Sequence, residues 1–486
     1  MTGATRPALR LASLLLCALA GCPRGATPST TSTSTPTTST AATTTPPPGD
    51  DAPADAKGSC RDWSSLDRSR LPALPQGPHM TLFDQVWTAV LERHYDPTLG
   101  CLDWPALRER YGAQVAGAKD DAAAYAAMNE MLAQLRQSHL GLVPPQRAMA
   151  AEPGQARPTG SGRVPIEITM AGDDVVVSSA AWLGKKSPVP AGATLLAIDD
   201  HALPQWVAQA GTQWSRPVER DLHVLMAARA WLSCDRGQSH SLTWQLPGAR
   251  KPASKTVACH VPQRRTATFG NLAGVPIESQ WRMLEPGIGY LQFNIWLLDL
   301  VGDIGKGMTE LRGQGMRALV LDLRGNPGGI GAMVVPVARM LLDRDADLGV
   351  MRMRDATQTF AVKRGDDPFT GPIAILVDEG TASTSEIFAQ ALQDLGRATV
   401  IGARETQGAA LPSLIEKLDE GALLQYVIAD YKSPKGTAVE GRGVLPDVVV
   451  PVSRDDLRKG RDPVLQAAIT ALSATAKATT HKESSP

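Results

Sequence analysis

The hydrophobic positions near the start of the folded chain recur at the spacing of an α-helix. The segments MTLFDQVWTAVLERHY (80–95) and AAAYAAMNEMLAQLRQ (122–137) each place apolar side chains on one helical face. These positions are Leu82, Val86, Val90 and Leu91 in the first segment and Tyr125, Met128, Met131, Leu132 and Leu135 in the second. The prolines of SHLGLVPP end the pattern, because a proline ring does not fit a helix interior. We therefore expect a helical domain over residues 59–150.

The pattern changes to strand-like alternation after residue 160. VPIEITMAGDDVVVSSAA alternates around a Gly-Asp-Asp turn, and PVPAGATLLAIDD is a short loop that enters an apolar strand. A helix, RDLHVLMAARAWL, and two strands, SLTWQLP and KTVACHV, follow. This order resembles a PDZ domain, a module that binds a peptide as an added strand, and we assign it to residues 155–266. SGRVPIEI lacks the usual carboxylate-binding loop, which argues against capture of free C-termini.

Strands and helices alternate from about residue 275. The strands GIGYLQF, RALVLDLR, PIAILVD and RATVIG are separated by helical segments at 298–312, at GAMVVPVARMLL and after Ser383. This alternation indicates an α/β core with a largely parallel sheet, which we place at residues 275–455. Residues 456–486 are expected to form a C-terminal helix and tail. The fold class is therefore multidomain α/β.

The N-terminus has the pattern of an export signal followed by a tether. Two arginines precede the apolar run LASLLLCALAG, which is too short to span a membrane and indicates a signal peptide over residues 1–22. Its end, LAGC, resembles a bacterial lipobox, which implies lipidation of Cys22; ordinary signal cleavage nearby is the alternative. Residues 23–58 are rich in Thr, Ser and Pro, as in a disordered tether. We expect a lipid-anchored protein of the cell envelope, and Pro23 favours the outer membrane.

Charge and cysteine content narrow the functional classes. Lys plus Arg and Asp plus Glu both number 49, so no net field favours nucleic acid or an anionic membrane. Four cysteines remain after Cys17 and Cys22, and an oxidising compartment favours their pairing. Proximity in sequence suggests the disulfides Cys60–Cys101 and Cys234–Cys259, although three pairings of the four are open.

Two segments of the α/β region have candidate chemistry. In VDEGTASTSEIFAQAL, Ser383 precedes Glu386 by three residues, which is either a helix-capping box or a nucleophile at a helix N-terminus. In LDLRGNPGGIG, glycines after a buried strand allow backbone to approach a ligand closely. The Lys-Ser/Thr of a phosphate-binding loop and the GxGxxG of a dinucleotide site are both absent there. Asp322 and Arg324 are interpreted as structural.

Five segments, taken in order, resemble the tricorn and C-terminal-processing serine protease family. They are GYLQF, LVLDLRGNPGG, ILVDEGTASTSEIFAQALQD, VIGARETQGAALPS and VEGRGVLPDVVV, and the resemblance covers most of residues 80–452. It implies a crotonase-like spiral protease core with Ser383, and not Ser385, as the nucleophile. The oxyanion donors would be the backbone N–H groups of Thr384 and of a glycine in NPGG, with Gly328 favoured over Gly329.

The resemblance also decides between two candidate bases. One branch of the family uses a lysine in the loop that is GARETQGAALPS here, which contains none; Lys417 lies well beyond it. The tricorn-like branch, which includes retinoid-binding relatives, takes a histidine from the helical domain. That position is His139, with Glu440 orienting it directly or through the Ser138 hydroxyl. Ala403 and Ala409 depart from the family pattern in a loop that lines the substrate cleft of relatives.

The implied activity is endopeptidase cleavage through an acyl-enzyme, with unfolded proteins or peptides as substrates and no cofactor. A catalytically inactive, PDZ-containing binding or scaffold lipoprotein is the alternative, and an esterase would use the same residues. We expect no metal site, because the remaining histidines have no ligand-like spacing. They are His79, His94, His201, His223, His240, His260 and His481.

Overall fold

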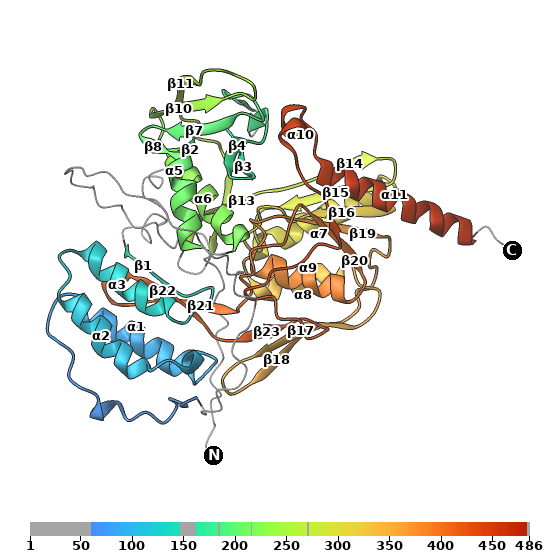
Figure 1. The fold of residues 1–486 in the computed structure, drawn as a ribbon. Coiled ribbons are helices and arrows are strands. Elements are labelled where there is room, and N and C mark those ends of the chain that lie inside the picture. Colours follow the sequence, from blue (N-terminus) through green and yellow to red (C-terminus); the bar gives the residue numbers. More distant parts are fainter. Residues whose placement is uncertain (1–59, 146–161, 183–184, 215, 270–271, 484–486) are drawn as a thin grey trace, which may run out of the picture.

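The computed structural model describes residues 60–145, 162–182, 185–214, 216–269 and 272–483. The expected signal peptide, the expected lipidation site Cys22 and the tether lie outside these residues. Within the described part of the chain, no helix has the length and apolar character needed to cross a membrane. Figure 1 shows an N-terminal helical part, a β-rich middle part and a larger α/β part from which the C-terminal helix projects.

Three helices form the N-terminal part: α1 (Met80–Arg93), α2 (Trp104–Ala116) and α3 (Asp121–Ala133). The carboxylates of Asp103 and Asp120 start α2 and α3 by accepting hydrogen bonds from backbone N–H groups of the first turn. Trp87 and Trp104 are fully buried between α1 and α2. The chain then leaves the helices and forms strand β1 (Gly141–Val143).

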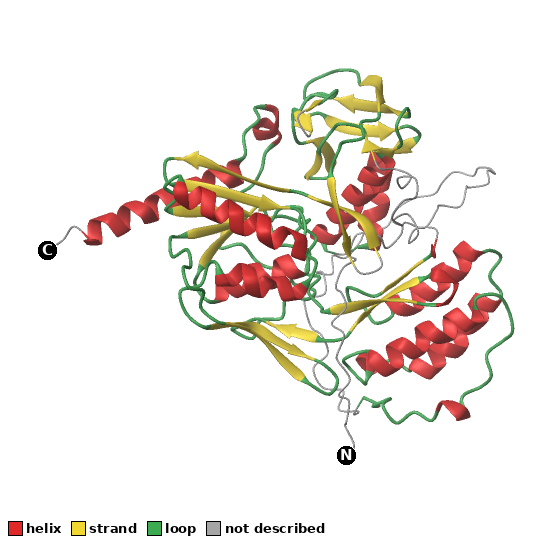
Figure 2. Cartoon of the chain, turned by 180° about the vertical axis from the view of Figure 1, so that it is seen from behind, coloured by secondary structure: helices red, strands yellow, loops and turns green. Residues whose placement is uncertain are grey.

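Strand β1 joins the N-terminal part to the rest of the molecule. It pairs antiparallel with β22 (Leu423–Val427), which pairs in turn with β21 (Ser413–Lys417). Figure 2 shows these strands between the N-terminal helices and the α/β part. Leu142 and Leu424 belong to the same buried cluster as the N-terminal helices. The expected helical domain thus ends in a strand, because its partner lies almost 300 residues away and no local pattern reveals it.

The middle part contains a sheet with the strand order β11-β10-β7-β4-β3, with β8 paired to β7. Its strands are β3 (Ile168–Ala171), β4 (Asp174–Val177), β7 (Thr194–Ile198), β8 (His201–Ala202), β10 (Ser239–Gln245) and β11 (Ala253–Ala258). Two helices, α5 (Leu203–Gln213) and α6 (Pro217–Trp231), pack against it. The sequence predicted only the second. Two short strand pairs complete this part: β2 (Gly162–Arg163) with β9 (Ser233–Cys234), and β5 (Ala181–Trp182) with β6 (Lys185–Lys186).

A hairpin of β12 (Arg265–Phe269) and β13 (Leu272–Ile277) leads into the six-stranded α/β sheet, whose order is β14-β15-β16-β19-β20-β24. The strands are β14 (Ser279–Glu285), β15 (Ile288–Phe293), β16 (Ala318–Asp322), β19 (Ile373–Val377), β20 (Ala398–Gly402) and β24 (Val448–Val449). All neighbours are parallel except β14 and β15. Helices cover both faces: α7 (Val301–Gly313), α8 (Val334–Arg339) and α9 (Thr384–Asp394) on one, and α11 (Pro463–Glu483) on the other.

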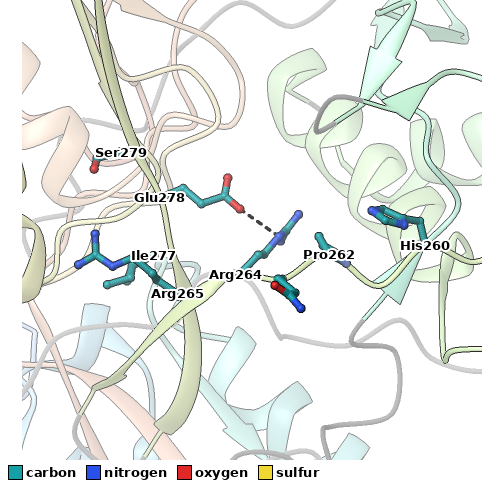
Figure 3. Close-up of a pocket in the computed structure, with 8 residues that line it drawn as sticks. His260, Pro262, Arg264, Arg265, Ile277, Glu278 and Ser279 are labelled. Carbon is teal, nitrogen blue, oxygen red and sulfur yellow. Dashed lines mark ion pairs between the residues drawn. The ribbon is translucent and has the colours of Figure 1, made fainter.

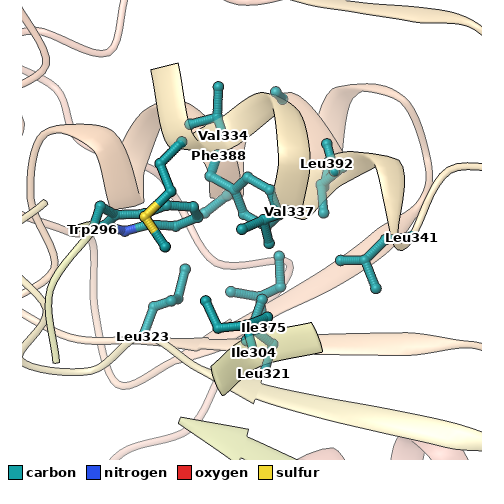
Figure 4. Close-up of a cluster of buried hydrophobic side chains, with 14 of the residues drawn as sticks. Trp296, Ile304, Leu321, Leu323, Val334, Val337, Leu341, Ile375, Phe388 and Leu392 are labelled. Atoms are coloured by element: carbon teal, nitrogen blue, oxygen red, sulfur yellow. The ribbon is translucent and has the colours of Figure 1, made fainter. Parts of the chain in front are cut away.

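The two faces explain why these strands are apolar throughout. Leu319 and Leu321 of β16 pack toward α7, α8 and α9, whereas Ala318 and Val320 pack toward α11. Figure 4 shows the first of these clusters, in which Trp296, Val334 and Phe388 lie above Leu321 and Ile375. Parallel strands buried on both faces need apolar residues at every position. The predicted parallel α/β arrangement is therefore present in the structure.

A further antiparallel sheet, ordered β18-β17-β23, consists of β17 (Ala346–Arg352), β18 (Thr357–Val362) and β23 (Asp430–Lys432). The turn between β17 and β18 reaches the N-terminal part, where Arg354 donates to the carbonyls of Leu91 and His94 at 2.8 and 2.9 Å. The remaining elements are α10 (Arg454–Arg458) and the short 3-10 helices η1 (Arg68–Arg70), η2 (Leu99–Cys101), η4 (Leu298–Leu300), η5 (Gly331–Met333) and η6 (Asp419–Gly421).

Two disulfides pair the four described cysteines. Cys60 is bonded to Cys101 in the N-terminal part, and Cys234 is bonded to Cys259 in the middle part. Each bridge joins segments of the same part.

Candidate active site

The structure brings Ser383 and His139 together although they are 244 residues apart in the chain. Ser383 lies where the loop after β19 enters α9, and His139 lies between α3 and β1. The Nε2 atom of His139 is 3.1 Å from the Ser383 hydroxyl. Both side chains are buried, with 7% and 9% of their surface exposed. This is the separation at which an imidazole can take a hydroxyl proton.

Ser138 and Glu440 extend the contact on the other side of the imidazole. The Ser138 hydroxyl is 2.7 Å from Nδ1 of His139 and donates to Glu440 Oε2 at 2.8 Å. The carboxylate of Glu440 also accepts the N–H groups of Ser138 and Ala410 at 2.8 and 2.9 Å. Because Glu440 accepts from the Ser138 hydroxyl, that oxygen is free to accept from Nδ1–H. Nε2 is then the unprotonated nitrogen, and it faces Ser383.

Burial sets the charge states in this chain of hydrogen bonds. Burial lowers the pKa of His139 to about 4, so its imidazole is neutral at neutral pH. Burial raises the pKa of Glu440 above its usual value, while the hydrogen bonds from Ser138, Ala410 and Leu411 favour its ionised form. A neutral imidazole next to a hydroxyl is a competent general base.

The backbone around Ser383 is shaped for close approach. Ser383 has φ 54° and ψ −121°, a conformation that few residues other than glycine adopt. Gly328 has φ 96° and lies directly against it: a Cβ atom at this position would be 2.6 Å from Ser383 Cβ and 2.8 Å from the Thr384 nitrogen. Gly329 packs just as closely on the Trp296 carbonyl. The NPGG turn therefore forms one wall beside the hydroxyl.

The predicted oxyanion donors differ in availability. The N–H of Gly328, the favoured glycine, already donates to Asn326 Oδ1 at 3.0 Å. Among the described residues, the N–H groups of Thr384 and Gly329 donate no backbone hydrogen bond. The Asn326 side chain in turn donates to the Phe293 carbonyl, which fixes it in place. In this conformation Thr384 and Gly329 are the open donors.

Several contacts around the site were not predicted. Glu386, recognised from the sequence only as a capping residue, accepts the Ser383 N–H at 3.0 Å and three further donors. Asn326 was part of a glycine turn without a role of its own. The Trp296 indole donates to Ser385 Oγ at 2.8 Å, which engages the second serine of the motif away from His139. Glu386, Ser385 and Asn326 lie inside motifs already chosen for Ser383 and the glycines, whereas Trp296 lies outside all of them.

The middle part also touches the site loops. Arg216, just before α6, donates to the carbonyls of Gln407 and Arg442 at 3.0 and 3.1 Å. Asp221 of α6 forms an ion pair with Arg404. These contacts attach the middle part to the two loops that surround Glu440.

Asp322 and Arg324 have structural contacts, as expected. Asp322 accepts the Tyr290 hydroxyl at 2.9 Å and pairs with Arg324, which also binds Asp462. This ion-pair cluster attaches the segment before α11 to the end of β16.

A cavity of about 430 Å³ lies elsewhere, where the middle part meets the α/β part (Figure 3). His260 and Pro262 lie on one side of it, and the ion pair of Arg264 with Glu278 crosses it. Neither Ser383 nor His139 lines this cavity. The cavity therefore lies between two parts of the molecule and is separate from the candidate active site.

In the part of the chain that the structure describes, one group of side chains has metal-ligating chemistry. The potential ligand atoms of Cys234, Cys259 and His240 lie within 4.8 Å of one another, although the sequence spacing of His240 gave no such indication. The two thiols form a disulfide, and His240 binds Asp199 and the Ser233 carbonyl. A disulfide cannot supply thiolate ligands, so the donor set does not fit a metal ion in this state.

Comparisons with known proteins find matches to both the N-terminal part and the α/β part. Residues 287–450 match the model of peptidase family S41, and residues 78–133 match that of the tricorn protease C1 domain. The carboxyl-terminal-processing protease of Synechocystis sp. is 27% identical over 413 residues, covering 82% of this chain and 88% of that protein. The chloroplastic C-terminal processing peptidase of Tetradesmus obliquus is 29% identical over 392 residues, with 78% of each chain covered.

Solved structures show the same fold. The photosystem II D1 C-terminal processing protease has 25% sequence identity and a TM-score of 0.51, covering 77% of this chain and 94% of that one. Mature CPAF, solved with lactacystin, has 12% identity and a TM-score of 0.56, covering 82% and 98%; this likeness concerns the fold alone. The chain belongs to the tricorn-like, C-terminal-processing family of serine proteases and is a serine-type peptidase.

Proposed function

We propose that this peptidase is an active endopeptidase in which Ser383 is the nucleophile and His139 is the general base. The observation that carries the proposal is the continuous chain of hydrogen bonds from Ser383 through His139 and Ser138 to Glu440. In this series of hydrogen bonds every donor faces an acceptor. Such an arrangement favours an active enzyme over the inactive scaffold, because a scaffold does not require a relay of protons.

The reaction follows from this order of groups. His139 Nε2 takes the Ser383 proton while Oγ attacks the carbonyl carbon of the scissile peptide bond. The imidazolium passes that proton to the leaving amine, the C–N bond breaks, and an acyl-ester remains on Ser383. Water then attacks the ester with His139 again as base, which releases the acid and restores the hydroxyl. Ser138 and Glu440 hold the imidazole and stabilise its charged form.

The negative charge of the tetrahedral intermediate would be held by backbone N–H groups. Thr384 supplies one from the first turn of α9, where the helix dipole adds a partial positive charge. Gly329 supplies the second, and Gly328 could join if its bond to Asn326 opened on substrate binding. A donor of this kind contributes about 3 kcal/mol to transition-state stabilisation.

The proposed substrates are peptides and unfolded proteins. The relatives named above process carboxyl termini, and we extend processing near a C-terminus to this chain. The middle part supports a PDZ-like assignment, because β3 is an edge strand and α6 packs beside it. A peptide could add to that edge. We assign the middle part to a PDZ-like module and the α/β part to a crotonase-like core. A peptide bound at β3 would then lie in the module that Arg216 and Asp221 connect to the loops of the site.

The proposed location is the bacterial cell envelope. A signal peptide ending at a lipidated Cys22, a tether and two disulfides together suit an exported protein anchored by lipid. Labelling with a radioactive fatty acid, and its loss in Cys22→Ala, would test the anchor.

One experiment separates enzyme from scaffold. A soluble form that starts near residue 51 should react with a fluorophosphonate probe at Ser383 and cleave an unfolded protein, whereas Ser383→Ala and His139→Ala should do neither. Absence of labelling from pH 6 to 9 would support the scaffold reading. Hydrolysis of small esters without peptide cleavage would support an esterase.

A further inference from the structure

Glu386 is a buried carboxylate that the reaction steps above do not use. It lies in the first turn of α9 and has no exposed surface. Each of its oxygens accepts two hydrogen bonds. Oε2 accepts the N–H groups of Ser383 and Ala409 at 3.0 and 2.9 Å, and Oε1 accepts the Gly408 N–H at 2.6 Å and the Thr406 hydroxyl.

All four of these partners are donors. An ionised carboxylate has only acceptor sites and can satisfy all four, whereas a glutamine amide would turn its own N–H groups toward at least one donor. A donor left facing another donor in a buried site costs about 1–3 kcal/mol. The site is therefore built for a carboxylate and not for a neutral amide of the same shape.

The first partner is the strained residue of the active site. The left-handed backbone of Ser383 costs on the order of 1–3 kcal/mol and persists only where surrounding contacts hold it. Its N–H is shared between Glu386 Oε2 and the Ala409 carbonyl, at 3.0 and 2.9 Å. These two acceptors restrain the backbone that aims the Ser383 hydroxyl at His139.

The other partners form the loop that reaches Glu440. Glu386 holds Thr406, Gly408 and Ala409, and the N–H of the next residue, Ala410, donates to Glu440 Oε2 at 2.9 Å. The Thr406 hydroxyl also accepts the N–H of Val444, in the turn that follows Glu440. One loop thus connects the carboxylate behind the nucleophile with the carboxylate behind the base.

We propose that Glu386 is a positioning residue that holds Ser383 and the loop 406–410 in the arrangement needed for catalysis, and that it does so only when ionised. The inference rests on the proposed function, since it assumes that Ser383 is the nucleophile. Protonation would replace one acceptor site with an O–H donor among four donors and would release part of the loop.

The ionisation of Glu386 falls in an accessible range. Burial raises its pKa to about 7, although its four hydrogen bonds act in the opposite direction. The charged or titratable groups facing this junction from neighbouring elements are His139 at Ser383, Glu440 at Ala410 and Arg216 at Gln407. The pKa of His139 lies lower, at about 4, but burial also raises the pKa of Glu440. Loss of the pH dependence near pH 7 in Glu386→Gln is therefore the result that assigns it to Glu386.

Glu379 provides a matched control. Burial and the neighbouring Asp378 also raise its pKa to about 7. Within the described residues, its carboxylate makes no hydrogen bond to Ser383 or to the loop 406–410. Glu379→Gln therefore removes a carboxylate of similar pKa close to the site and leaves the hydrogen bonds of Glu386 in place.

The test measures the second-order rate of fluorophosphonate labelling of Ser383 from pH 5.5 to 8.5, together with thermal unfolding by circular dichroism. The labelling rate of the wild type should rise as the pH increases through about 7, and Glu379→Gln should keep this limb of the pH–rate profile. Glu386→Gln should label roughly 10- to 100-fold more slowly at pH 8, and its rate should no longer rise through pH 7. Thr406→Val, which removes one donor and keeps the volume, should lower the rate less and retain the limb.

Several results would overturn the inference. Folded Glu386→Gln contradicts it if its labelling rate at pH 8 equals that of the wild type, or if its labelling rate still rises with pH through about 7. If Glu386→Gln does not fold, Thr406→Val decides: labelling equal to wild type contradicts the role of the Glu386 cluster. A wild type that does not label at all refutes the proposed function itself, and the two failures are thereby distinguished.

Discussion

The imidazole of His139 lies 3.1 Å from the hydroxyl of Ser383, a residue 244 positions later in the chain. The pairing of β1 with β22 holds the segment that follows His139, and Arg354 ties the end of α1 to the β17–β18 turn. His139 itself has φ 59°, so its backbone needs such restraint. The candidate active site is therefore assembled at a junction between two parts of the molecule.

Removal of the Ser138 hydroxyl should weaken catalysis without weakening substrate binding. In Ser138→Ala, Nδ1–H of His139 loses its acceptor and Glu440 loses one donor, a cost of about 1–3 kcal/mol. We expect kcat to fall roughly 10- to 100-fold with KM nearly unchanged, measured on an unfolded protein or peptide substrate. Ser138→Thr keeps the hydroxyl and should retain most activity. Equal loss in both variants would point to packing and not to the relay.

Glu440→Gln should be more damaging than its small change in shape indicates. Glu440 accepts hydrogen bonds from the N–H groups of Ser138 and Ala410 and from the Ser138 hydroxyl, and all of these groups are donors. An amide in its place would turn the Ser138 hydroxyl toward Nδ1 and favour the wrong tautomer of His139. A fall in kcat of about 100-fold or more is expected from steady-state kinetics. A variant with wild-type kcat would exclude Glu440 from the relay.

Gly328 and Gly325 offer a comparison within one turn. Both have positive φ, 96° and 69°, so alanine is strained at either position. Only at Gly328 would the new Cβ press on Ser383 and the Thr384 nitrogen; at Gly325 nothing lies within 4 Å.

We therefore expect Gly325→Ala to lower stability by about 1 kcal/mol and to keep its probe labelling. Gly328→Ala should lose labelling at Ser383 at temperatures where it remains folded. Comparable labelling of both variants would show that the wall beside the hydroxyl tolerates a side chain.

The stability of the protein should depend on the His139 imidazole at acid pH. Its pKa is about 4 when folded, below the ordinary value of 6.5, because burial opposes the charged form. Between these values the unfolded chain binds the proton more readily, so this group makes the folded state less stable as the pH falls from about 6.5 to 4. The full effect is on the order of 3 kcal/mol.

His139→Gln lacks that group. Urea unfolding of wild type and His139→Gln at several pH values should show the wild type losing stability relative to the variant as the pH falls through this window. A difference that does not change with pH would mean that the imidazole is not withdrawn from solvent.

Much of the α/β part followed from the sequence, for a physical reason. Strands buried on both faces must be apolar along their length, as in RALVLDLR, and their parallel neighbours require helices between them. The segments around Ser383 and Gly328 stood out for a different reason, because turns at strand ends need particular residues. His139 and Glu440 were implied only by the family resemblance. Helix α5 was missed, since its buried face contains only Leu203, Val207 and Ala210 and depends on packing against the sheet.

The chain by itself determined the local elements and the residue types at the site, because periodicity and turn chemistry act over a few neighbouring residues. Only the tertiary structure decided that His139 meets Ser383 and that Glu386 binds Thr406, Gly408 and Ala409. Those contacts join residues separated by 20 to 244 positions, and hydrogen bonds over such separations leave no periodic pattern in the sequence.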